Sequence, residues 1–449
     1  MVPILRPRDF REQPYRRPRP APDSSLSIAE IRQLAHRAFP LIHRHLQLPR
    51  PPTALYSSES CLAIPLLSDL RRTSPEHAAR EAHLLVQLSP QGRRFLLPSA
   101  DTALAALHAL GTSPLLAGLQ TLLDDQIAHA VPTDAVPARE PLILAGDCHD
   151  VRTYHRKHPL QPPSRPRPSR ALPLAVGTKP DRGTALAYRF LTLTTTRGAP
   201  LTVAARPFLP LERLAPKLAE VLADAERRLS RRPDLLLYDA AAYAIATLRT
   251  LESVHLSYIV RVPQNSRMAR LCRAHSGLLC YLLPDFEIRD TSGRADAPRA
   301  RFTLVAVSRD LLDQVRIDLP HTEREVKWFL YATNLTPRPG ETEREFALRI
   351  ALLYKERWDV ETGYRGIEEL RGFTHALHYD IRLLQFFLAV VLANVWALQR
   401  ERTGAAWTKA EVALVLYVAL LLGLTGEGSV ARHELEISSG AVHPSVALG

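Results

Sequence analysis

The chain has few of the features that mark secreted or membrane proteins. Its 449 residues include only four cysteines, too few and too scattered for a disulfide framework, which favours a reducing compartment. The amino terminus is rich in Arg and Pro and lacks the apolar core of a signal peptide. Two apolar runs, 383–398 and 412–424, are shorter than the roughly 20 residues of a membrane-spanning helix and are predicted to be core helices. We therefore expect a cytoplasmic protein without a membrane segment.

Zinc-finger ligands are also lacking. Cys272, His275 and Cys280 lie close together in the sequence, but no fourth ligand stands at zinc-finger spacing. We interpret these cysteines as ordinary buried thiols.

Positive charge is what the chain has in excess. Lys and Arg total 58 against 46 for Asp and Glu, which gives a formal net charge of +12. Such a protein attracts polyanions, of which nucleic acid is the commonest, although a basic surface can also serve solubility alone. The length is about three times that of a usual domain, so two or three domains are expected.

The first third of the chain divides into two regions. Residues 1–25 carry many Pro and Arg and almost no periodic apolar residues, which predicts a disordered basic arm. Residues 26–135 show apolar residues at steps of three and four, such as Ile28, Ile31 and Leu34, which predicts a small helical domain.

A change of pattern at Pro141 predicts an α/β region. A short apolar run reads as a buried strand that ends at Gly146 and Asp147, and a Pro- and Arg-rich linker follows at 155–173. The order of the next elements predicts a sheet with helices on its faces. They are strands 186–196 and 201–205 joined as a hairpin, helix 211–229, strand 235–238 ending at Asp239, helix 244–251 and strand 257–262.

The last third begins with further strands and continues with helices. Runs 301–308 and 326–333 are strand-like and define a β-rich segment, 285–342. Thr342 followed by Glu345 is a capping-box pattern, which predicts that a helix begins at Glu343. We expect helices over 343–425 and a flexible tail over 426–449.

Three acids are candidates for a metal site. Asp147 and Asp239 follow predicted strands, and carboxylates at the ends of neighbouring strands converge on hard cations such as Mg²⁺ or Mn²⁺. Glu361 lies on the predicted helix with Tyr354, Arg357 and Arg365 on the same face. The alternatives are that the aspartates cap turns and that the helix face is solvated with ordinary ion pairs. Asp150 is a rival for the first ligand.

The helix sequence YKERWDVETGYRGIEELRGF resembles the Tyr-Arg-Glu-Lys signature of DDE transposases of bacterial insertion sequences, in the family numbered four. Four other segments resemble that family in the same order. They are LILAGDCHDVRTY, VGTKPDRGTALAYRF, LLLYDAAAYAIATL and WFLYATNL. Together the five segments span roughly 141–398.

The resemblance implies a ribonuclease-H-like mixed sheet with flanking helices, a first core part at 141–284, a β-rich insertion, and a helical N-terminal domain that binds DNA. It implies cut-and-paste transposition at a site where Asp147, Asp239 and Glu361 hold two Mg²⁺ or Mn²⁺ ions. The expected partner is double-stranded DNA, both terminal inverted repeats and target, bound by a homodimer at the nucleoid. The implied DNA contacts are Lys179, Arg182, Tyr354, Arg357 and Arg365.

Two departures from the family leave other functions open. The signature Lys is replaced by Glu368, and Ala240 to Ala242 stand where Arg-Gly-aromatic is usual. The chain could therefore be an inactive or co-opted DNA-binding derivative, or a metal-dependent nuclease unrelated to mobile elements. Trp328 could stack on a flipped base, although core packing is the more usual role of a strand tryptophan.

Overall fold

The computed structural model forms two compact units, a sheet unit of residues 126–365 and 400–404 and a helical unit of residues 38–125, 366–399 and 408–424. The described residues are 38–88, 97–131, 135–153, 174–181, 183–290, 297–317, 326–374, 378–403 and 408–424, and within them the side chains of 86, 88, 181, 358–366, 403 and 422–424 are left out. The predicted basic arm, the 155–173 linker and the predicted tail lie outside the described residues.

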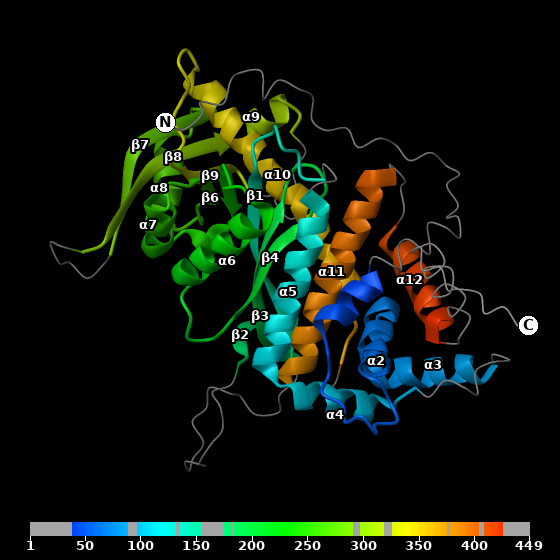
Figure 1. The fold of residues 1–449 in the computed structure, drawn as a ribbon. Coiled ribbons are helices and arrows are strands. Elements are labelled where there is room, and N and C mark those ends of the chain that lie inside the picture. The colour runs from blue at the N-terminus through cyan, green and yellow to red at the C-terminus, as the bar shows by residue number, and fades with distance from the viewer. Residues whose placement is uncertain are drawn as a thin grey trace, which may run out of the picture. The chain divides into compact units, whose positions relative to one another are not determined.

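The sheet unit is built on one nine-stranded sheet (Figure 1). Its order is β2-β3-β1-β5-β6-β9-β8-β7, and β4 pairs with the other part of β3. The strands are β1 (Ile143–Arg152), β2 (Val176–Asp181), β3 (Thr184–Thr195), β4 (Thr202–Phe208), β5 (Leu235–Tyr238), β6 (Ser257–Arg261), β7 (Cys280–Arg289), β8 (Arg299–Ser308) and β9 (Trp328–Thr333). The antiparallel strands β4, β3 and β1 are followed by β5 and β6, which run parallel to β1. The ribonuclease-H-like mixed sheet predicted from the sequence is therefore present.

Strand β1 is longer than predicted. It continues past Asp147 to Arg152, because β3 pairs with it over that whole length, up to Arg152 opposite Ala187. On its other side β1 pairs with β5 only as far as Gly146 opposite Tyr238. Asp147 therefore does not end β1. It is the first residue of β1 beyond the pairing with β5.

The hairpin between β3 and β4 forms as predicted, and its turn needs a glycine. Gly198 has φ +70°, a conformation that side chains disfavour, and a methyl group there would come within 2.4 Å of the Ala135 carbonyl oxygen. Both the backbone angle and the available space therefore require glycine.

Helices cover both faces of the sheet. Directly paired residues of neighbouring strands point to the same face, so Cys148, Leu191 and Arg206 share one face. Helix α6 (Leu214–Leu229) covers this face, since its Asp224 forms an ion pair with Arg206. Asp147 points to the opposite face, toward helix α10 (Glu343–Glu369).

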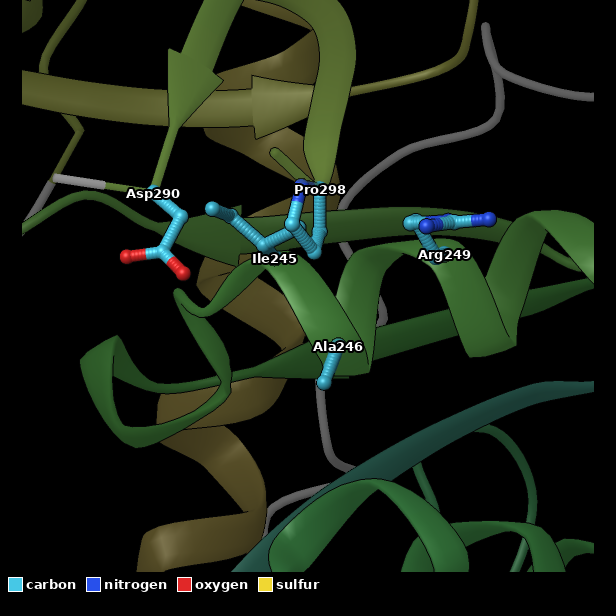
Figure 2. A pocket seen from close by; sticks show the side chains of 5 residues that line it. All are labelled: Ile245, Ala246, Arg249, Asp290 and Pro298. Atoms are coloured by element: carbon cyan, nitrogen blue, oxygen red, sulfur yellow. The ribbon is translucent and has the colours of Figure 1, made fainter. Parts of the chain in front are cut away.

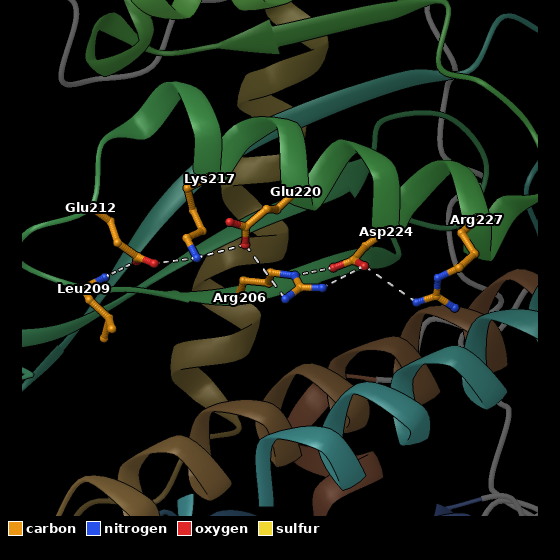
Figure 3. Close-up of polar contacts among 7 residues, drawn as sticks. All are labelled: Arg206, Leu209, Glu212, Lys217, Glu220, Asp224 and Arg227. Atoms are coloured by element: carbon orange, nitrogen blue, oxygen red, sulfur yellow. Dashed lines mark hydrogen bonds and ion pairs between the residues drawn. The ribbon is translucent and has the colours of Figure 1, made fainter. Parts of the chain in front are cut away.

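A chain of ion pairs fastens α6 to β4 (Figure 3). Arg206 donates from Nε and Nη2 to the two carboxylate oxygens of Asp224, at 2.6 and 3.0 Å. Lys217 bridges Glu212 and Glu220 at 2.7 and 3.0 Å. Asp224 is largely buried and Arg206 is one-third exposed, so this two-point contact is partly shielded from water.

The β-rich insertion is part of the same sheet rather than a separate one. Strand β9 pairs antiparallel with β6, and β8 and β7 follow in turn. Strand β7 was not predicted because Pro284 interrupts its pattern; it stands at a register shift on the edge of the sheet, where proline is tolerated. Helix α7 (Ile245–Ser253) lies between β5 and β6, α8 (Ser266–Ala274) between β6 and β7, and α9 (Arg309–Gln314) between β8 and β9.

The start of α10 confirms the predicted capping box. The backbone amide of Thr342 donates to the Glu345 carboxylate at 2.9 Å, and the amide of Glu345 donates to the Thr342 hydroxyl at 3.2 Å. These two bonds satisfy amides that a helix start would otherwise leave without partners.

The helical unit contains residues 38–45, helices α2 (Ser58–Arg71), α3 (Pro75–Leu88), α4 (Ala100–Leu110) and α12 (Lys409–Leu424), and most of α5 (Thr112–Ala130) and α11 (Tyr379–Thr403). The segment Tyr379–Arg402 is long and apolar enough to cross a membrane, but 83% of its most apolar window is buried inside the structure. It is therefore a core helix, as predicted. Asp69 of α2 is fully buried and accepts a hydrogen bond from the Gly372 amide at 2.7 Å.

Candidate active site

Asp147 on β1 and Asp239, which directly follows β5, lie near each other. Gly146 of β1 pairs with Tyr238 of β5, and each of these residues directly precedes one of the two aspartates. Because the strands are parallel, the two aspartates follow this last pair at the same level of the sheet. The side chain of Asp147 is 23% exposed, so ligands have access to it.

Local hydrogen bonds orient both carboxylates. Oδ1 of Asp147 accepts from the Cys148 amide at 2.9 Å. Oδ1 of Asp239 accepts from the Ala241 amide at 3.1 Å and caps the short 3-10 helix η4 (Ala240–Ala242). Each bond engages one oxygen of the carboxylate and fixes the direction of the other.

Helix α10 brings a cation to this pair. Arg357 is 5% exposed, and its Nη2 lies 3.6 Å from Oδ1 of Asp147. The preceding residue, Glu356, accepts from Thr196 Oγ1 and Arg197 Nη2, both at 2.8 Å. These contacts hold the helix beside the β3–β4 turn and so fix the position of Arg357.

Tyr354 packs into the sheet one turn before Arg357. It is 2% exposed, and its ring centroid lies 4.9 Å from that of Tyr331 on β9. Burial raises the pKa of Tyr354, and Arg357 opposes this rise. The hydroxyl therefore stays protonated at neutral pH, and the ring sets the rotation of α10 over the sheet.

Cys148, on the opposite face of β1, is influenced by the charges of both aspartates. Burial raises the pKa of the Cys148 thiol to about 12; a hydrogen bond with Tyr238 lowers it, and Asp147 and Asp239 both raise it. Cys148 is thus a neutral thiol at physiological pH and no nucleophile.

The rival acid Asp150 is engaged elsewhere. Arg189 on β3 donates to both of its oxygens, at 2.7 and 2.9 Å. Asp150 lies beyond the end of the pairing between β1 and β5, three residues from Asp147. It is therefore not a partner of Asp239 in the way that Asp147 is.

The structure describes some of the other predicted site residues and not the rest. Residue 361 lies on α10, one turn beyond Arg357, but the side chains of Glu361 and Arg365 are outside the described ones, as is Arg182. Lys179, one of the implied DNA contacts, lies on β2 and is exposed. Trp328 is half-buried, and its ring packs 5.4 Å from that of Tyr281.

The donors suit a hard divalent cation. Carboxylate oxygens on neighbouring strands are the ligands that Mg²⁺ and Mn²⁺ prefer. Oδ2 of Asp239 makes no hydrogen bond or ion pair with the described residues. Those residues hold no group of three metal-binding side chains, since the third predicted ligand, Glu361, is not among them.

A separate cavity of about 420 Å³ lies at the start of α7 (Figure 2). Its lining includes Ile245, Arg249 and Asp290, and none of the three predicted acids. It is thus distinct from the paired aspartates.

Comparison with known proteins gives one family. Residues 215–396 match the transposase DDE domain. The matched segment contains Asp239 and position 361, begins after Asp147, and spans less than half of the chain. It supports a DDE transposase, a class of enzymes that cleave and transfer DNA strands with divalent metal ions. No curated protein matches the sequence.

Two solved structures are similar to the chain. The piggyBac transposase synaptic complex with hairpin DNA has a TM-score of 0.48 and 11% identity, with 93% of this chain and 84% of that chain covered. The Mos1 transposase paired-end complex with left transposon end has a TM-score of 0.18 and 14% identity, with 51% and 67% covered.

Proposed function

We propose that the chain is a metal-dependent transposase that cleaves and joins DNA at transposon ends by cut-and-paste transposition. The observation that carries the proposal is the pair of adjacent carboxylates, Asp147 and Asp239, with the buried Arg357 beside them. The family match over 215–396 supports the same reaction class. We assign the chain to the insertion-sequence family numbered four because of the segment around Glu361.

The residues of the site divide the work as follows. Asp147, Asp239 and Glu361 would hold two Mg²⁺ or Mn²⁺ ions, which stabilise the charge on the attacking and leaving oxygens of an in-line displacement. Arg357 partly neutralises the negative charge of Asp147. Tyr354 and Glu356 hold α10 in place, and with it Arg357.

We assign DNA recognition to the helical domain and to individual cations of the chain. Residues 26–135 would bind the terminal inverted repeats as a helical domain, and Lys179 on β2 offers an exposed cation for a phosphate. We also assign phosphate contacts to Arg182 and Arg365. Tyr354 and Arg357 are buried, so we assign Tyr354 to the packing of α10 and Arg357 to the contact with Asp147. Two ends must be brought together, which calls for a homodimer on DNA.

The test is metal-dependent cleavage of a duplex that carries the DNA flanking the coding region. Asp147→Ala, Asp239→Ala and Glu361→Ala should each abolish cleavage and leave DNA binding largely intact, because phosphate contacts by Lys and Arg dominate affinity. Asp150→Ala is the matched control, since it removes a carboxylate that lies three residues after Asp147 on the same strand and is paired with Arg189, and it should retain cleavage. Normal cleavage by Asp239→Ala would show that the site is wrongly assigned.

One observation favours a second function, a DNA-binding derivative that no longer cuts. Glu368 places an exposed acid near the end of α10, where the family signature has a Lys. Calorimetry with Mn²⁺ and a nicking assay on the same protein separate the two. Metal binding without nicking would favour the derivative, and both together would exclude it.

A further inference from the structure

Gly146 and Tyr238, which directly precede the two aspartates, are in close contact. They are directly paired across β1 and β5, and they are the last pair before the aspartates. A methyl group built on Gly146 would come within 2.3 Å of Cδ2 and Cε2 of the Tyr238 ring, and within 3.4 Å of Leu193 on β3. The ring therefore occupies the space that any side chain at position 146 would need.

The Tyr238 ring cannot move aside to make that space. It is fully buried, on the face of the sheet that α6 covers. Its hydroxyl lies 3.6 Å from the Cys148 sulfur, two residues along β1 on the same face. The ring thus lies along β1 from Gly146 to Cys148, opposite to the face from which Asp147 projects.

Space, rather than backbone freedom, accounts for this glycine. Unlike Gly198, Gly146 lies within a regular strand and does not adopt a positive φ. A glycine inside a strand weakens the strand and marks a close approach of another group. Here the approaching group is an aromatic ring from the neighbouring strand.

We propose that Gly146 and Tyr238 are positioning residues, and that their contact sets the separation of the Asp147 and Asp239 carboxylates. Beyond this pair β1 and β5 share no further pairing, so the spacing of the next residues follows from the spacing of this one. The inference rests on the proposed metal-dependent function, because a separation matters most where two carboxylates must share ions about 4 Å apart.

The first test is Mn²⁺ affinity measured by titration calorimetry. Gly146→Ala should weaken Mn²⁺ binding by about tenfold or more, the usual effect of disturbing residues that orient metal ligands. Gly177→Ala is the matched control: it lies on β2 of the same sheet, with nothing within 4 Å of an added methyl group, and should bind Mn²⁺ as the wild type does. A folded Gly146→Ala protein with wild-type affinity would overturn the proposal.

A second pair of variants covers the case in which Gly146→Ala fails to fold. Tyr238→Phe keeps the ring and should retain Mn²⁺ affinity within about threefold. Tyr238→Leu removes the ring without adding a clash and should bind Mn²⁺ about tenfold more weakly. If only the hydroxyl of Tyr238 mattered, both variants would lose the same affinity. Equal affinities of the two variants would contradict the proposal.

A readout without metal separates this inference from the proposed function. Crystal structures of the wild type and of Gly146→Ala, or of Tyr238→Leu, should differ in the separation of residues 147 and 239. If the wild type binds no Mn²⁺ while the separation changes, the proposed function is wrong and the positioning role stands. An unchanged separation refutes the positioning role whatever the metal affinity is.

Discussion

Replacing Arg357 by Gln tests whether this residue serves the acids or the DNA. In the structure its guanidinium is buried, 3.6 Å from Oδ1 of Asp147, and Asp239 directly follows β5, the strand paired with β1. The substitution removes the positive charge of Arg357 from beside Asp147. We expect the metal-free protein to lose about 1–3 kcal/mol of unfolding free energy, the usual cost of removing one partner of a largely buried polar pair.

Mn²⁺ should reverse part of that loss. The guanidinium repels a divalent ion bound at Asp147, so its removal should tighten Mn²⁺ binding. Each tenfold gain in affinity adds about 1.4 kcal/mol to the stabilisation by saturating metal. The variant should therefore be less stable than the wild type without Mn²⁺, and more strongly stabilised by it.

The assay is urea unfolding with and without Mn²⁺, combined with calorimetry. Arg189→Gln is the matched control, because it breaks the ion pair to Asp150, an acid on the same strand whose exposure is close to that of Asp147, and it should leave the Mn²⁺ increment unchanged. An Arg357→Gln protein that is folded, equally stable without metal and no better stabilised by Mn²⁺ would refute the reasoning. That result would favour the DNA contact that the family signature implies for Arg357.

Three further predictions concern stability. Asp224→Ala should lower the unfolding free energy by about 1–3 kcal/mol in guanidinium unfolding, because it strips Arg206 of its two-pronged partner, and no loss would show that the network on α6 is unimportant. Thr342→Ala should cost about 1 kcal/mol by removing the cap of α10, whereas Thr342→Ser should cost little. Burial raises the pKa of Asp69 well above its ordinary 3.8, and the Gly372 amide opposes this, so the folded chain keeps a proton that the unfolded chain releases. Stability should thus fall as pH rises from about 4 toward the raised pKa. Asp69→Asn should flatten that slope, and an unchanged pH profile would argue against a raised pKa.

Elements with a clear local pattern were predictable. Strand β5 occupies Leu235–Tyr238 as its apolar run indicates, and the capping box marks the start of α10. The second half of β1 was missed because Asp147 to Arg152 are largely polar and owe their strand conformation to the pairing with β3, which comes from elsewhere in the chain. Strand β7 was missed because it needs an edge position to accommodate Pro284.

The candidate site was predictable in part. Two acids after neighbouring parallel strands are expected to meet, and the register does bring Asp147 beside Asp239. The ion pair between Arg357 and Asp147 could not be predicted. Helix spacing suggests Glu361, four residues further on, as the partner of Arg357, whereas Asp147 is more than two hundred residues away. The role of Gly146 could not be predicted from the sequence either. A glycine before an aspartate is common in turns, and only the ring of Tyr238 explains it here.

The pairing of β9 with β6 bears on how a long ligand would be aligned. Hydrogen bonds run without a break from β5, through β6 and β9, to the hairpin of β7 and β8. If that hairpin held a nucleic acid, the sheet between them would fix the distance from the hairpin to Asp239. In such an arrangement the distance between the point of grip and the point of cutting is fixed by strand spacing and does not depend on a hinge.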